Sequence, residues 1–139
     1  MPRYYWRDFL GVSALLLSGC CSGENLRIAK EATTHVHAQM DSEQFGQLYS
    51  EADDALRAAT KHQDFLDFMG AVHRKLGRVQ NVSQTGFFVN FTTSGTRVRL
   101  NYQTKFDGGE AQEEFIWKIK GNQAALVGYH INSTALITK

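Results

Sequence analysis

Three side chains in the C-terminal half of the sequence are of the types that acid–base catalysis uses. Thr104, Glu113 and His130 lie on three consecutive segments of alternating apolar and polar residues, and two-residue turns between these segments would place them side by side. A carboxylate beside an imidazole orients the ring as a general base, and a nearby hydroxyl holds a substrate or a water. In a non-catalytic protein the same carboxylate and imidazole would be an ion pair that closes the rim of the core. The sequence leaves both interpretations open.

Two further histidines, His35 and His37, have a spacing that would suit a metal ion if their segment were a strand. The segment has a helical pattern instead, and residues two apart on a helix do not share a face. The sequence also has no glycine-rich phosphate loop, nucleophile elbow or CxxC motif. We therefore predict no metal and no cofactor, and we interpret Asp53 and Asp54 as solubilising charge on an exposed helix face.

The N-terminus has the pattern of an export signal. Arg3 and Arg7 precede an apolar stretch over residues 9–17, which is shorter than the roughly 20 residues of a membrane-spanning helix. The sequence Leu17-Ser18-Gly19-Cys20 resembles the bacterial lipobox, in which the chain is cut before the cysteine and the thiol receives diacylglycerol. The alternative is an ordinary secretory signal with an incidental cysteine. We expect a lipoprotein signal peptide over residues 1–19 and lipid, such as palmitate, on Cys20.

Lipid on Cys20 would attach the protein to a membrane of the bacterial cell envelope, because two or three acyl chains anchor stably. Cys21 follows, rather than the Asp that retains enterobacterial lipoproteins in the inner membrane, so this resemblance favours the outer membrane, facing the periplasm. Removal of residues 1–19 takes away two of the 15 basic and one of the 14 acidic residues, which leaves 13 of each. A neutral domain lacks the basic surface that nucleic acid requires, so no nucleic-acid partner is expected.

Two hydrophobic periods divide the rest of the chain. Residues 20–28 are polar and are expected to form a lipidated tether, and residues 29–139 a single domain. A period of three to four predicts helices over 29–40, 45–59 and 61–76, the last ended by Gly77. Asp41 with Gln44, and Thr60 with Gln63, have the spacing of helix-capping pairs.

After Gly77 the period changes to two, which predicts four strands. Turn signals at Ser94-Gly95, Gly108-Gly109 and Gly121-Asn122 separate the strands. The expected fold class is α+β, with the N-terminal helices packed on a four-stranded antiparallel meander sheet. The register pairs apolar with apolar side chains: Phe91 with Val98, Val89 with Leu100, Phe87 with Tyr102, Leu100 with Trp117, Tyr102 with Phe115, and Trp117 with Leu126.

The outer face of this sheet is predicted to be mixed. Its polar members are Arg97, Arg99, Gln103, Lys105, Gln112, Glu114, Lys118 and Lys120, with Gln103 opposite Glu114 and Arg99 opposite Lys118. Four apolar residues are expected on the same face and would form a patch for a protein partner or a homodimer: Ile116, Val127, Tyr129 and Ile131. The alternative is that the C-terminal residues 134–139 fold back over this patch.

From His37 to Ser133 the order of short motifs resembles a family of uncharacterised exported bacterial proteins, domain-of-unknown-function family 4019 (DUF4019). The motifs are MDSEQF, LYSEAD, Leu76-Gly77, RVRLNYQTKF, EEFIWKI and LVGYHI. The resemblance implies a helix layer on a curved sheet, similar to cystatin-like and nuclear-transport-factor-like (NTF2-like) cones. It implies no catalytic residues.

The sequence indicates the cellular location of the protein more directly than its molecular function. We expect a membrane-anchored envelope lipoprotein whose domain is a non-catalytic binding or interaction module. The alternative is a small hydrolase or isomerase that uses Glu113 and His130 in the cleft of the cone, with Thr104 beside them.

Overall fold

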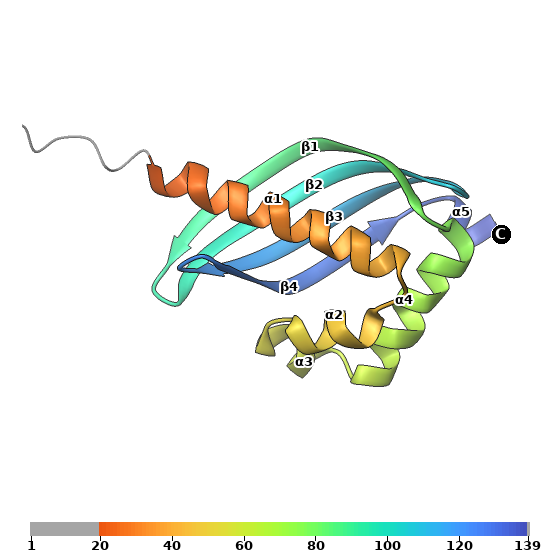
Figure 1. The fold of residues 1–139 in the computed structure, drawn as a ribbon, viewed down its shortest axis with the longest axis horizontal. Helices are drawn as coiled ribbons and strands as arrows, with labels where there is room; N and C mark the ends of the chain where they lie inside the picture. Colours follow the sequence, from red (N-terminus) through yellow and green to blue (C-terminus); the bar gives the residue numbers. More distant parts are fainter. Residues whose placement is uncertain (1–19, 139) are drawn as a thin grey trace, which may run out of the picture.

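The chain folds as a layer of helices on one face of a four-stranded antiparallel sheet, and the computed structural model describes residues 20–138 (Figure 1). The elements are α1 (Cys20–Asp41), α2 (Phe45–Glu51), α3 (Asp54–Ala59), α4 (His62–Leu76), β1 (Val79–Thr92), β2 (Gly95–Phe106), β3 (Gly109–Lys120), β4 (Gln123–Asn132) and α5 (Ala135–Thr138). The predicted α+β class and the meander order β1-β2-β3-β4 are confirmed. The predicted signal peptide lies outside the described residues.

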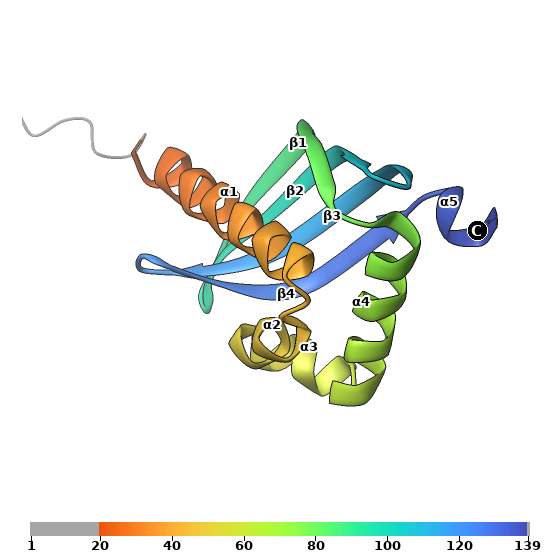
Figure 2. The ribbon, with the colours of Figure 1, turned by 45° about the vertical axis from the view of Figure 1, so that its right-hand side comes forward.

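The core lies between α1 and the concave face of the sheet, and α4 extends it beyond β4 (Figure 2). Buried and more accessible residues alternate along β2 and β3, as they do in a sheet with one covered face. The largest fully buried side chains of these two strands are Phe115, Leu100, Val98 and Thr104. The polar residues predicted for the outer face all lie there, none of them buried.

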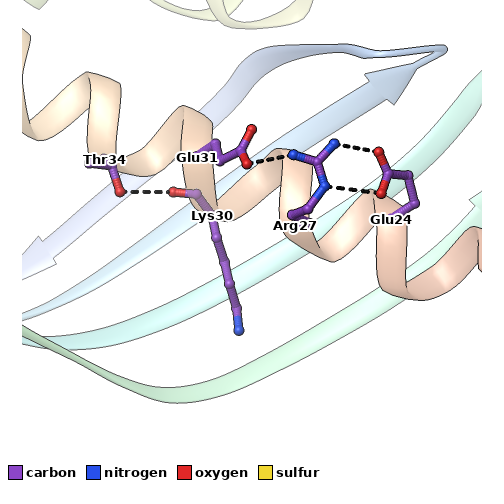
Figure 3. Close-up of polar contacts among 5 residues, drawn as sticks. All are labelled: Glu24, Arg27, Lys30, Glu31 and Thr34. Carbon is purple, nitrogen blue, oxygen red and sulfur yellow. Dashed lines mark hydrogen bonds and ion pairs between the residues drawn. The ribbon is translucent and has the colours of Figure 1, made fainter.

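Helix α1 begins at Cys20, nine residues before the predicted start, so the segment expected to be a tether is helical. Arg27 forms ion pairs with Glu24 and Glu31, one turn to either side (Figure 3). Ile28 is buried and Leu26 packs against the core. A mostly polar segment stays an extended tether when its few apolar side chains have nothing to pack against. Here Leu26 and Ile28 pack against the core, so the segment is helical.

The predicted helix over residues 45–59 is interrupted at Asp53, which is the N-cap of α3 and not a solubilising charge. Its carboxylate accepts a hydrogen bond from the Ala55 N–H at 3.0 Å, and its own N–H donates to the Leu126 carbonyl of β4 at 2.9 Å. A short polar side chain that bonds the backbone competes with helix continuation. Asp54 is exposed and paired with Arg57.

The two predicted capping pairs are wrong, whereas the predicted helix end at Gly77 is confirmed. Asp41 is the last residue of α1 and accepts from the Val79 N–H at 3.0 Å, and Thr60 is the residue after α3. Gly77 has a φ of 73°, and a Cβ there would lie 2.9 Å from the Cβ of Asp107. Only glycine therefore fits this turn from α4 into β1.

The first two hairpins turn one residue earlier than predicted, which shifts the partner of every residue by two. Thr92 pairs with Gly95, and Phe106 with Gly109, so each glycine follows its turn instead of forming it. A Cβ at Gly95 would lie 2.8 Å from the Ile119 carbonyl oxygen, which explains why glycine stands at this strand position. A shift of two preserves the faces but changes every partner.

The predicted partners in β1–β2 and β2–β3 are accordingly wrong. The observed apolar pairs are Val89 with Val98, Phe87 with Leu100, Val98 with Trp117 and Leu100 with Phe115. On the outer face Gln103 is opposite Gln112, and Arg99 is opposite Ile116. The third hairpin is as predicted, with Trp117 opposite Leu126.

Candidate functional site

A β-bulge in β4 decides which side chains of this strand face the helices. Trp117 is opposite Leu126, but the preceding residue Ile116 is opposite Gly128, so Val127 is an extra residue without a partner. An extra residue reverses the alternation of faces. From Gly128 onward, every side chain of β4 lies on the face opposite to the predicted one.

The predicted trio of Thr104, Glu113 and His130 is therefore not assembled. His130 is exposed on the outer face, opposite Glu114, whereas Glu113 is buried on the core face. Thr104 is opposite Ala111, and its buried hydroxyl has no hydrogen-bond partner among residues 20–138. The two-residue shift between β2 and β3 separates Thr104 from Glu113. The bulge turns His130 to the outer face, away from Glu113.

Glu113 instead lies between a histidine from α1 and a tyrosine from β4. Its side chain is fully buried, with Oε1 2.9 Å from His37 Nε2 and with Oε2 accepting from the Tyr129 hydroxyl at 2.6 Å. An ionised carboxylate only accepts hydrogen bonds, so an ionised Glu113 pairs with the His37 tautomer that carries its proton on Nε2. We call His37, Glu113 and Tyr129 the Glu113 network; it joins α1, β3 and β4.

Aromatic rings surround the Glu113 network and shape its electrostatics. The His37 ring meets Phe115 edge-on at a centroid distance of 5.3 Å. Burial raises the pKa of Tyr129 well above its usual value, and the charge of Glu113 and the hydrogen bond to it add to this rise. Burial also raises the pKa of Tyr102. Both hydroxyls therefore stay protonated at neutral pH, and Tyr129 acts as a donor.

The spacing of residues on α1 is a signal that His37 faces the core, although it does not indicate the contact with Glu113. Ala29, Thr33 and His37 are buried at intervals of four residues, and the Trp117 Nε1–H donates to the Thr33 hydroxyl at 3.0 Å. His35 is exposed, with its Nε2 3.6 Å from a carboxylate oxygen of Glu51. The two histidines point to different sides of the helix, as predicted.

The Glu113 network has the composition of an acid–base pair, but the carboxylate itself has no access to substrate. A general base must come within hydrogen-bond reach of the proton it removes. The Glu113 side chain is fully buried, whereas His37 lines an open groove of about 280 Å³ between α1 and β1. The groove is lined by Thr33, Thr34, His37, Ala38, Asp41, Val79, Val82 and Tyr102.

A second groove lies along the free edge of β4, between this strand and helices α3 and α4. We call it the β4 groove; its volume is about 400 Å³, and most of its lining is apolar. Phe65 and Phe68 of α4 form one wall, and Val127 at the bulge forms part of the other. The remaining lining residues are Leu56, Ala59, Thr60, Ile116, Gly128, Tyr129 and His130.

The predicted outer patch is divided by the same bulge. Tyr129 and Ile131 turn inward and pack against the core, and Ile131 does not line the β4 groove. The C-terminal residues do not cover the patch either, because α5 packs against α4, with Lys75 Nζ donating to the Leu136 carbonyl at 2.5 Å. What remains of the patch is Ile116 and Val127, both within the β4 groove.

Comparison with known proteins does not assign the chain to a family. No family model matches the sequence, and no curated protein matches it. Within residues 20–138, no helix has the length and apolar character needed to span a bilayer. The same residues contain no group of three or more histidine, cysteine, aspartate or glutamate side chains arranged to hold a metal ion. Functional inference therefore rests on the geometry of the grooves and on the N-terminal sequence.

Proposed function

We propose that this protein is a lipoprotein of the bacterial cell envelope whose domain binds an apolar segment of a partner protein in the β4 groove. The observation that carries the binding proposal is the groove itself, which combines an apolar wall on α4 with a bulged edge strand. Its volume is in the range of ordinary ligand sites. The lipobox and the resemblance to DUF4019 support export and lipid attachment at Cys20.

The edge of β4 favours an extended partner segment. The Asp53 N–H already bonds the Leu126 carbonyl and so covers the first part of this edge. Beyond the bulge, Gly128 and His130 border the groove, where a partner strand adds main-chain hydrogen bonds while its apolar side chains enter the groove. Phe68, with 43% of its surface exposed, is the largest accessible apolar group there.

Photo-crosslinking in the envelope tests the binding proposal. A photoreactive residue at Ala59, which lines the groove, is expected to give a discrete crosslinked product. Phe68→Lys places an ammonium group in the apolar wall and is expected to remove that product, whereas Ile137→Lys, at an exposed position of α5, is expected to retain it. A product that survives Phe68→Lys, or the absence of any product from Ala59, would contradict the proposal.

Lipid attachment has a separate test. The intact mass of the membrane-extracted protein is expected to correspond to a chain that starts at Cys20 and carries acyl groups. Cys20→Ser is expected to give an uncleaved chain without acyl mass. A mature chain that starts at another residue, or one of unmodified mass, would refute the lipoprotein assignment.

One observation favours a second candidate function, a hydrolase or isomerase. Glu113 orients the His37 ring, and His37 lines the groove between α1 and β1, so the imidazole of such an enzyme is His37 and not His130. A general base contributes about 100- to 10,000-fold to a rate. If a panel of esters and ketones reveals turnover, His37→Asn must lower it by that factor while His130→Asn leaves it unchanged. Equal turnover in the two variants would exclude this candidate.

A further inference from the structure

The free edge of the sheet at β1 has a composition that edge strands usually avoid. None of its 14 residues is charged and none is proline, although charged residues and proline are the usual protection of an exposed edge. Three phenylalanines near its end, Phe87, Phe88 and Phe91, have exposed fractions of 60%, 61% and 60%. We call these three residues the aromatic tip.

The aromatic tip presents rings on both faces of the strand. Phe87 and Phe91 share the face of Val89, which is the face that carries α1, and Phe88 lies on the other. The remaining exposed residues of β1 are polar apart from Val82. The exposed aromatic surface of β1 is therefore confined to the hairpin end of the strand.

The aromatic tip lies beside the end of α1 at which the predicted lipid is attached. Phe91 pairs with Thr96 across the hairpin, and the Asn25 side-chain amide donates to the Thr96 hydroxyl at 3.3 Å. Asn25 is five residues from Cys20, or about 8 Å along a helix. Figures 1 and 2 show the N-terminal end of α1 and the β1–β2 hairpin at the same end of the molecule.

Cationic side chains flank the aromatic tip. Arg97 is opposite Asn90 of β1, and the stem of Lys120 lies beside Gly95 at the turn. Neither cation has an ion pair within the described part of the chain. Residues 86–97 contain no acidic residue. Exposed rings bordered by cationic side chains suit the interfacial layer of a bilayer with anionic headgroups.

A second copy of the chain is the other occupant that an uncharged edge suggests, but the geometry of β1 disfavours it. Edge-to-edge pairing needs a long regular strand, and β1 has register irregularities at Val79/Asn81 and at Gln84/Gly86. Pairing of β1 with a second copy would also bury the polar residues of the strand as much as the three phenylalanine rings. The confinement of the rings to the anchored end favours a membrane.

We propose that the aromatic tip inserts into the interfacial layer of the bilayer that holds the lipid on Cys20, and so fixes the orientation of the domain. This inference rests on the lipid attachment of the proposed function. Because β1 and β4 are opposite edges of the sheet, the β4 groove then faces away from the membrane, where a partner has access to it.

Tryptophan quenching in vesicles tests the orientation. The acylated protein carrying Phe88→Trp is reconstituted into vesicles of phosphatidylethanolamine and phosphatidylglycerol, with part of the lipid brominated near the carbonyl end of its chains. The emission of the new tryptophan is expected to be quenched, because a ring in the interfacial layer lies at the depth of the bromine atoms. The remaining tryptophan of the cleaved chain, Trp117, is 3% exposed in the core and gives a constant background.

The matched control is Phe68→Trp, which places an accessible tryptophan beside the β4 groove and is expected to show no quenching. Adding Phe87→Ser and Phe91→Ser to Phe88→Trp is expected to reduce the quenching, with the far-UV circular dichroism unchanged because both rings are exposed.

Each alternative outcome identifies what failed. An acylated protein with unquenched Phe88→Trp, or with equal quenching of Phe88→Trp and Phe68→Trp, overturns the orientation and leaves the lipoprotein assignment intact. Unquenched Phe88→Trp together with a crosslinked dimer shows that a second copy covers β1. A protein without acyl mass overturns both proposals.

Discussion

The carboxylate of Glu113 is buried with one donor on each oxygen, and a buried charge becomes costly when it loses a donor. Tyr129→Phe keeps the ring and removes only the donor. We expect a loss of about 1–3 kcal/mol in the free energy of unfolding, measured by urea denaturation. The control is Tyr49→Phe, which removes bonds from a half-buried hydroxyl to backbone carbonyls and is expected to cost less. Equal losses would show that the carboxylate does not depend on Tyr129.

The raised pKa of Tyr129 predicts a dependence on alkaline pH. Because the fold disfavours the tyrosinate, this group's contribution to stability is complete below the ordinary tyrosine pKa of about 10 and is lost as the pH rises toward the higher folded-state pKa. In an absorbance titration of the cleaved protein, Tyr129 is expected to ionise in a late step, above the ordinary tyrosine pKa. Tyr129→Phe should remove the late step. A titration in which the variant keeps that step would contradict the assignment.

Asp53 links two elements, and its pKa makes the link sensitive to acid. The Ala55 N–H first, and then the charges of Lys118 and Arg97, lower the pKa of Asp53. A lowered folded-state pKa means that the stabilisation is present above the ordinary aspartate pKa of about 3.9 and is lost as the pH falls through the folded value. Asp53→Asn retains a side chain that can cap the helix but does not titrate. Between about pH 5 and about pH 3, the unfolding free energy of this variant should therefore fall less than that of the unsubstituted protein.

Two comparisons isolate the capping role. Asp53→Ala is expected to cost about 1 kcal/mol at neutral pH, since it removes the side chain that accepts from Ala55. Asp54→Asn, one residue along, changes an exposed carboxylate and is expected to leave the acid transition unaltered. If Asp54→Asn shifts the transition as much as Asp53→Asn, the effect is one of general charge.

At the scale of elements, the hydrophobic periods predicted where helices and strands lie but not how the strands are paired. A two-residue shift keeps apolar residues on the core face, so the pattern tolerates either register in the first two hairpins. In the observed register Gly95 of β2 lies against the Ile119 carbonyl oxygen of the neighbouring strand β3, where a Cβ would be only 2.8 Å from it. The bulge had one local signal, the lone Gly128 within a strand pattern, which is typical of a bulge.

At the scale of the whole molecule, the positions of the two cysteines predict that the fold does not depend on a disulfide. Its two cysteines, Cys20 and Cys21, are adjacent and lie at the start of α1, so no disulfide crosses the core. The urea midpoint of the full protein is therefore expected to be the same with and without a thiol reductant. A lower midpoint under reduction would show that an intermolecular disulfide contributes to stability.

The two edges of the sheet also differ at this scale. β1 is uncharged and aromatic at the end where the chain begins, whereas β4 is covered in part by Asp53 and borders an apolar groove. Our two proposals assign one edge, β1, to the membrane and the other, β4, to a partner. The experiments at Phe88 and Phe68 address these two edges separately.

The sequence by itself determined the α+β class, the meander of four strands, the end of α4 at Gly77 and the face of each residue in β2 and β3, because periods of two and of three to four are local properties. Tertiary structure alone decided which groups meet Glu113. The bulge at Val127 turned Tyr129 inward and His130 outward, and the packing of α1 brought His37 across 76 positions of sequence to the carboxylate. Gly128 is a local signal that a bulge can form, but the side chains that the bulge turns inward and the helix that packs on them are set by packing energies, which no local pattern records.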